Sequence, residues 1–132
     1  MNRNSKGFTL IELVTVIAIL GVLAAMTVPK FFALQAKARF EVEAQIIGSI
    51  RAGLETYAAN QIVKFGSKSY PQASSVDLLD EVLNPVPDEW TFAQNVTGTI
   101  KHSRSDSNVT WTYVSTGGDT YTIGTRTPVI KP

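Results

Sequence analysis

The sequence predicts an α+β fold in which one long N-terminal helix, hydrophobic and partly embedded in a membrane, packs on a small antiparallel β-sheet. Three observations support this prediction. Residues 8–28 form a predominantly apolar run with a single charge, residues 40–58 carry apolar side chains at intervals of three and four, and the chain beyond Trp90 alternates apolar and polar residues. The first two patterns are helical and the third is typical of half-buried strands.

The composition fits one small globular domain joined to a membrane segment. The chain has 132 residues, of which 44% are hydrophobic and 17% are charged, and its formal net charge is +1. Because there is no cysteine, disulfides, thiolate catalysis and cysteine-based metal sites are excluded. The balanced charge predicts no specific nucleic-acid partner, and no motif indicates a cofactor.

The apolar run is long enough to cross a membrane. Twenty-one residues from Phe8 to Val28 make a helix of about 31 Å, close to the roughly 30 Å hydrocarbon core of a bilayer. Arg3 and Lys6 precede the run and no acid does. The positive-inside tendency therefore predicts a cytoplasmic N-terminus, with the rest of the chain facing outward.

Glu12 is the one charged residue inside this run. A charge in a membrane helix costs about 2.5–3.5 kcal/mol at the centre and less near an end. A secretory signal peptide, the first alternative, usually avoids that cost. It would also be cut after Ala24 or Ala25, which puts Val22 or Leu23 where a small residue is preferred. The carboxylate therefore indicates a function other than simple export.

The stretch "KGFTLIELVTVIAILGVLAAMTVPKF" resembles the amino-terminal signature of type IV prepilins and type II secretion pseudopilins. The following helix, "PKFFALQAKARFEVEAQIIGSIRAGLETYAANQ", is similar to that of the mannose-sensitive-haemagglutinin branch of pilins. The resemblance implies cleavage between Gly7 and Phe8 by a prepilin peptidase, which also methylates the new amino terminus of Phe8.

The resemblance also implies a division of the chain into four segments. Residues 1–7 are a leader peptide that the peptidase removes, and residues 8–29 are a hydrophobic helix for membrane insertion and assembly. Residues 30–62 continue the helix in amphipathic form. Residues 63–132 make a small globular domain with a loop, a short helix and a β-meander.

The implied cleavage gives Glu12 a partner. It creates an α-amino group on Phe8 that still carries a proton after methylation. In a stack of identical helices, the Glu12 carboxylate of one subunit can pair with the Phe8 amine of its neighbour, so the cost of the buried charge is recovered only on assembly. The alternative is a lone acid that reaches toward lipid headgroups or is favoured by the helix dipole.

Gly21 and Pro29 lie eight residues apart in the helix. Glycine lowers helix propensity, and proline removes a backbone donor. The pair predicts a flexible segment, and family filaments often unwind in this region. The alternative is that both residues are simply tolerated, because they are common in membrane helices.

The amphipathic part of the helix is predicted to end near Ile62. Its core-facing stripe comprises Phe40, Ala44, Ile47, Ile50, Leu54, Tyr57 and Ala58. The charged pairs between them form a solvated face: Lys37 with Glu41, Arg39 with Glu43, and Arg51 with Glu55. Gly48 and Gly53 weaken the helix and predict the close approach of another segment.

The C-terminal half begins with a loop and a short helix. The segment "KFGSKSYPQASS" is a loop by composition, and a helix is predicted from Val76 to Leu83, with Ser74 and Asp77 as a capping box. The acidic residues Asp77, Asp80, Asp88 and Glu89 match no calcium-loop spacing. We therefore interpret them as capping and solvated residues.

The strands follow as an antiparallel meander. It is predicted from "GTIKHS", "NVTWTYVS" and "TYTIGT", with "STGGD" as a hairpin loop. Val109, Trp111 and Tyr113 share one face, which is predicted to pack on the helix stripe, and Trp90 and Phe92 add to the same core. The NVT sequons at Asn95 and Asn108 are interpreted as turn and strand residues.

No catalytic motif is present. His102 is the only histidine, so a multi-histidine metal site is excluded, and no nucleophile or phosphate-loop motif accompanies it. The resemblance therefore implies a structural subunit that forms a homo-oligomeric helical filament, and no enzyme.

The implied partners are the membrane, the prepilin peptidase and methyltransferase, and the inner-membrane pilus assembly machinery. The implied locations are the inner membrane before assembly and a cell-surface pilus afterwards. A pseudopilin in a periplasmic filament of a secretion or DNA-uptake system is the alternative. The cysteine pair that closes the C-terminal loop of many pilins is absent. A monomeric membrane-anchored binding module is a third hypothesis, in which the leader stays uncut.

Overall fold

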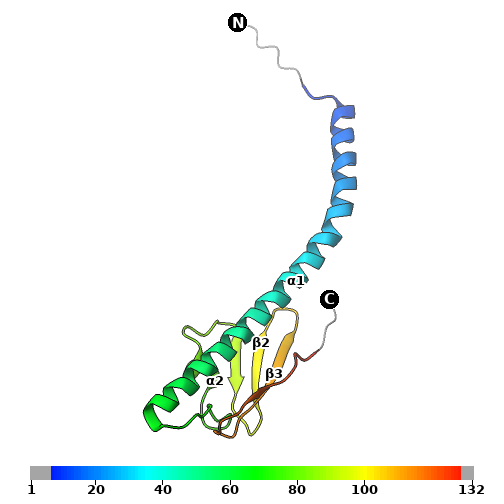
Figure 1. Ribbon diagram of the computed structural model, residues 1–132. Coiled ribbons are helices and arrows are strands. Elements are labelled where there is room, and N and C mark those ends of the chain that lie inside the picture. Colours follow the sequence, from blue (N-terminus) through cyan, green and yellow to red (C-terminus); the bar gives the residue numbers. More distant parts are fainter. Residues whose placement is uncertain (1–6, 129–132) are drawn as a thin grey trace. The chain divides into compact units, whose positions relative to one another are not determined.

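The computed structural model of the protein describes residues 7–128 (Figure 1). The chain divides into two compact units, one ending at Glu41 and one beginning at Val42, and each is described by itself. The elements in chain order are α1 (Leu10–Phe65), α2 (Leu78–Val82), β1 (Trp90–Ala93), β2 (Gly98–Ser103), β3 (Asn108–Val114) and β4 (Thr122–Ile123). The fold class is α+β, as predicted.

Helix α1 is 56 residues long and passes through both Gly21 and Pro29 without a break in its assignment. It ends three residues beyond the predicted end at Ile62, because Val63, Lys64 and Phe65 contain no helix breaker. The first residue that stops it is Gly66, whose φ of 74° is the left-handed conformation common just after a helix. The Gly66 amide donates to the Ile62 carbonyl over 2.8 Å and closes the last turn.

The second unit contains the sheet, whose strand order β1-β2-β3-β4 is the predicted antiparallel meander with one additional strand. Strand β1 was not predicted as a strand, although Trp90 and Phe92 were correctly assigned to the core. It pairs with β2 in a register that places Trp90 opposite His102 and Phe92 opposite Ile100. Both side chains therefore point to the same face as the inward residues of β2.

The core lies between this face of the sheet and the part of α1 that belongs to the second unit (Figure 1). The helix contributes Ile47, Ile50, Leu54 and Ala58, and β3 contributes the predicted Val109, Trp111 and Tyr113, all of them buried. The predicted stripe is wrong at Phe40 and Ala44, which are exposed, and Tyr57 is only half-buried.

Helix α2 confirms the predicted short helix, although it is shorter at both ends. Its N-cap is Asp77, whose carboxylate accepts from the Leu79 amide over 3.0 Å, so the predicted capping by Ser74 is wrong. A Cβ at Gly53 would collide with the Val82 carbonyl and lie 2.8 Å from the Val82 Cβ. The predicted close approach is therefore confirmed at Gly53, whereas Gly48 faces open space.

Candidate functional site

The first unit exposes an apolar helical surface. Every large apolar side chain from Phe8 to Leu34 is exposed, and among the described residues α1 is the only helix long and apolar enough to cross a membrane. Within residues 7–128, the most apolar stretch of this helix has no buried side chain. Because this helical surface is long, apolar and exposed, we expect a bilayer or other helices to surround it.

Glu12 lies in the first turn of α1 and is hydrogen-bonded to Thr9. The Thr9 amide and hydroxyl donate to Glu12 Oε2 over 3.2 and 3.1 Å, and the Glu12 amide donates to the Thr9 hydroxyl over 3.3 Å. This reciprocal arrangement is a capping box, which satisfies backbone donors at the start of a helix. The Thr-x-x-Glu spacing in "FTLIE" was a signal for it that the sequence interpretation missed.

The capping box gives Glu12 a partner inside the uncut chain. Gly7 and Phe8 precede the helix, and Phe8 is 87% exposed. While residues 1–7 are attached, the Phe8 nitrogen is an uncharged amide. Within the described residues Glu12 is therefore held by Thr9 and not by Phe8.

Gly21 and Pro29 both lie inside α1. Proline has no amide hydrogen, so the carbonyl of Ala25, one turn before Pro29, lacks its usual helical donor. In the same turn the Thr27 hydroxyl donates to the Leu23 carbonyl over 3.0 Å. Such threonine bonds satisfy polar groups internally, which is required in an apolar environment.

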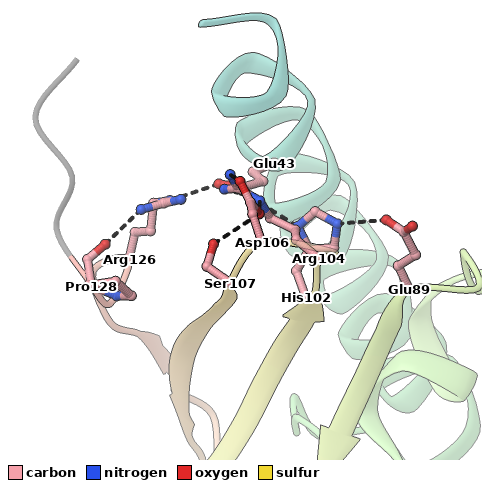
Figure 2. A network of polar contacts seen from close by, with 8 residues as sticks. All are labelled: Glu43, Glu89, His102, Arg104, Asp106, Ser107, Arg126 and Pro128. Carbon is pink, nitrogen blue, oxygen red and sulfur yellow. Dashed lines mark hydrogen bonds and ion pairs between the residues drawn. The ribbon is translucent and has the colours of Figure 1, made fainter. Parts of the chain in front are cut away.

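A second carboxylate of α1 has a different environment (Figure 2). Glu43 was assigned to the solvated face, but only 1% of it is exposed, so that assignment is wrong. Arg126 Nε donates to Glu43 Oε2 over 2.7 Å, and Arg104 Nη1 donates to Oε1 over 3.1 Å. His102 Nδ1 lies 3.1 Å from Oε1, and its Nε2 lies 3.2 Å from Glu89 Oε2. Three segments of the second unit therefore converge on one helical residue.

The cluster brings acidic and basic side chains into contact. Glu43 has Arg104, Arg126 and His102 as partners, and Asp106 accepts from Arg104 over 3.2 Å. Burial raises the pKa of Glu43, but the hydrogen bonds from Arg126, His102 and Arg104 outweigh this effect and hold the pKa below its ordinary value. The carboxylate is therefore ionised at neutral pH.

His102 was assigned no role by the sequence interpretation. It is buried and stacks on Trp90 with ring centroids 4.7 Å apart, and Trp90 stacks on Trp111 at 5.3 Å. The two ring nitrogens of His102 face two different carboxylates, Glu43 and Glu89. The sequence positions of Glu43 and His102 could have predicted their burial. Glu43 precedes Ile47 by four residues and so lies on the buried stripe of the helix. His102 follows Gly98 and Ile100 at intervals of two and so lies on the inward face of β2.

The acidic segment gives no metal centre. Within residues 7–128 no group of three or more histidine, aspartate or glutamate side chains is arranged to hold an ion. Asp77 caps α2 and Glu89 contacts His102.

Comparisons with known proteins agree with the N-terminal signature. Residues 2–28 match the family model described as the prokaryotic N-terminal methylation motif. The chain is 34% identical to the type IV narrow pilus major component PilA5 of Thermus thermophilus, over 90% of this chain and 94% of that protein. It is 35% identical to a fimbrial protein of Neisseria meningitidis, over 84% and 74% respectively.

A third similar protein belongs to a secretion system. The chain is 34% identical to the type II secretion system core protein G of Pseudomonas aeruginosa, over 67% of this chain and only 60% of that protein. No solved structure matches the chain significantly. None of these three relatives carries the name of an enzyme.

Proposed function

The chain belongs to the family of type IV pilins and type II secretion pseudopilins, and we propose that it polymerises through its N-terminal helix into a cell-surface filament of the type IV pilus kind. The observation that carries this proposal is the apolar surface of residues 8–34, whose large apolar side chains are all exposed and which contains Glu12. Packing identical helices together would shelter both the apolar side chains and the carboxylate.

The first step we propose is removal of residues 1–7. A prepilin peptidase in the inner membrane would cut between Gly7 and Phe8, which precede the helix and are exposed, and would methylate Phe8. Mass spectrometry of filaments sheared from cells should find a chain that begins at N-methylated Phe8, seven residues shorter than the 132-residue precursor. An intact Met1 chain in filaments would contradict the proposal and favour an uncut membrane anchor.

The second step is docking of Glu12 on a neighbour. Cleavage turns the uncharged Phe8 amide into an ammonium group, so the incoming subunit brings a cation into an apolar environment. The Glu12 carboxylate of a subunit already in the filament is the matching anion. Because both ions are expensive to bury alone, the pair would select one axial position of the new subunit and reject others.

We propose that the segment from Gly21 to Pro29 loosens in the filament. The Ala25 carbonyl lacks its helical donor because of Pro29, and Gly21 resists unwinding least. A filament map should show less regular helix here than between Phe40 and Tyr57. A continuous straight helix through both segments would contradict the proposal.

A pseudopilin of a secretion or DNA-uptake system remains the second candidate, supported by the similarity to core protein G. We favour the pilus because the match to the narrow pilus component covers 94% of that protein, against 60% of core protein G. Electron microscopy of cells with and without the gene separates the two. Long surface filaments that vanish with the gene support the pilus, and filaments confined to the periplasm support the pseudopilus.

A further inference from the structure

Two stretches of the chain carry charges of a single sign. Between Glu12 and Glu41 every charged residue is basic, and between Lys68 and Lys101 every charged residue is acidic. We call residues 30–39 the basic segment and residues 77–89 the acidic segment. The basic residues are Lys30, Lys37 and Arg39, and the acidic ones are Asp77, Asp80, Glu81, Asp88 and Glu89. Surfaces of opposite sign attract one another and fix the register of an interface.

The basic segment lies on an exposed face of α1. Lys30, Leu34 and Lys37 follow one another at intervals of four and three residues, so they share one face of the helix. All three are exposed, and within residues 7–128 neither lysine has a hydrogen-bond or ion-pair partner. The distance from Glu12 to Lys30 along the sequence is roughly five full helical turns. In the described chain this face is therefore continuous with the one that contains Glu12.

The acidic segment reaches the level of Glu43 on α1. Glu89 Oε2 lies 3.2 Å from His102 Nε2, and His102 Nδ1 lies 3.1 Å from Glu43 Oε1 (Figure 2). Asp88, the preceding residue, is exposed and has no polar partner within residues 7–128. These contacts place Asp88 and Glu89 beside the turn of α1 that contains Glu43.

We propose that Lys37 of one subunit pairs with Asp88 and Glu89 of a neighbouring copy of the chain, so that the basic and acidic segments form a second assembly contact outside the membrane. The inference rests on the proposed filament, because its occupant is a second copy. It adds to the docking of Glu12 a contact between parts of the chain that follow the membrane-length run.

The apolar residues of the basic segment favour a protein partner. Phe31, Phe32 and Leu34 are 65%, 62% and 67% exposed. Residues 8–28 already match the roughly 30 Å hydrocarbon core of a bilayer, so these three side chains lie beyond it. A neighbouring subunit supplies both the carboxylates for the lysines and a surface that removes the apolar side chains from water.

The axial spacing of the residues supports the pairing. In a filament of identical subunits, every residue is displaced from its counterpart in the neighbour by the same distance. Docking of Phe8 on the Glu12 of a neighbour displaces the two subunits by four residues of helix, about 6 Å. Glu43 lies six residues beyond Lys37, about 9 Å, so the same displacement brings Lys37 toward the neighbour's Glu43 turn. The flexible lysine stem spans the remaining difference.

Disulfide trapping tests the pairing, because the chain has no cysteine of its own. Filaments of a variant that carries both Lys37→Cys and Asp88→Cys are sheared from cells, oxidised mildly and run on a denaturing gel without reductant. We expect a ladder of covalent oligomers, since each subunit then carries both halves of a bridge. Either single variant should give no ladder.

Asp119 provides a matched control for the trapping experiment. It is exposed in the loop after β3. Because His102 pairs with Val109 near the start of β3, this loop lies at the end of the sheet opposite to His102. Lys37→Cys combined with Asp119→Cys should therefore give no ladder. Filaments of the Lys37→Cys and Asp88→Cys variant that give no ladder, or only internally bridged monomers, would overturn the proposal.

Charge reversal is a second test that needs no cross-link. Lys37→Glu places a carboxylate against Asp88 and Glu89, so the ratio of sheared filament to membrane pool should fall about tenfold. Adding Asp88→Lys to Lys37→Glu should recover most of this loss. Arg51→Glu, at an exposed position of α1 outside the basic segment, should leave the ratio near its native value. An unchanged ratio in Lys37→Glu, or an equal loss in Arg51→Glu, would refute the pairing.

Filaments of the native chain are the reference for both tests. If the native chain forms filaments but the ladder and the effect of Lys37→Glu are absent, the pairing is wrong and the proposed function stands. If the native chain forms no filament, the proposed function itself is wrong.

Discussion

Two glutamates of helix α1, Glu12 and Glu43, lie in different units of the chain and have different environments. Glu43, in the second unit, is almost fully buried and is held by Arg126, Arg104 and His102. Glu12, in the first unit, accepts hydrogen bonds from Thr9 and lies in a stretch whose apolar side chains are all exposed. Glu43 therefore has its hydrogen-bond partners within the chain. Glu12 lies on an apolar surface that needs other molecules to cover it.

This difference distinguishes a charged residue that stabilises the fold of its own chain from one that acts in the assembly of several chains. A buried carboxylate is tolerated when cations and donors surround it, and the cost of removing one partner is then measured as folding stability. A carboxylate that lies in an exposed apolar stretch and bonds within its own helical turn contributes little to the tertiary fold of its own chain. Its effect should be measured in filament assembly, whereas the effect of a buried structural carboxylate should be measured in folding stability.

The largest effect is expected for Glu12→Ala. Membrane insertion should be unchanged or slightly improved, because a costly charge leaves an apolar helix. Filament yield should fall roughly a hundredfold or more, since burying the neighbour's Phe8 ammonium without its partner costs about 3–5 kcal/mol. The measurement compares the membrane pool with the sheared filament fraction in a strain lacking the native copy.

Two further variants separate docking from helix capping. Glu12→Gln keeps the shape and some hydrogen bonding, so it should assemble better than Glu12→Ala but worse than the native chain. Thr9→Val removes the capping hydroxyl and leaves the carboxylate, so it should assemble far better than Glu12→Ala. If Thr9→Val is as damaging as Glu12→Ala, or Glu12→Ala filaments are normal, Glu12 is not the docking group.

Glu43→Ala should have the opposite signature. Arg104, Arg126 and His102 lose the carboxylate that they share, so the second unit should be destabilised by about 3–5 kcal/mol. Chemical denaturation followed through Trp90 and Trp111, the only two tryptophans, reports on this unit. Glu41→Ala, an exposed glutamate two residues earlier on the same helix, should change stability by less than about 0.5 kcal/mol. Equal effects would show that Glu43 does not support the fold.

The smallest effects are expected at two glycines of α1, Gly53 and Gly48, which have different surroundings. At Gly53 an added methyl group would collide with Val82 of α2, whereas Gly48 faces open space. Gly53→Ala should therefore destabilise the second unit by about 1–3 kcal/mol. Gly48→Ala should stabilise it by roughly 0.5–1 kcal/mol through helix propensity, provided that only the isolated subunit is measured. Denaturation of both variants checks the two signs, and a loss of stability in Gly48→Ala would show that this position is also covered.

By itself the sequence determined the features that depend on near neighbours. The membrane-length run, the leader signature, the amphipathic stripe from Ile47 to Ala58 and the alternation of β3 are all patterns within a few turns or one strand, so their periodicity predicts them. Even the capping box of Thr9 and Glu12 was readable, because its partners are three residues apart.

The burial and the contacts of Glu43 and His102 were decided only by the tertiary structure. The partners of Glu43 lie 59, 61 and 83 residues away along the chain, and no local pattern states which distant cation will reach a given acid. Local reasoning therefore assigned Glu43 to solvent, where charged helix residues usually lie. Folding of the sheet onto α1 brings Arg104, Arg126 and His102 to it, and their hydrogen bonds offset the cost of burying the carboxylate.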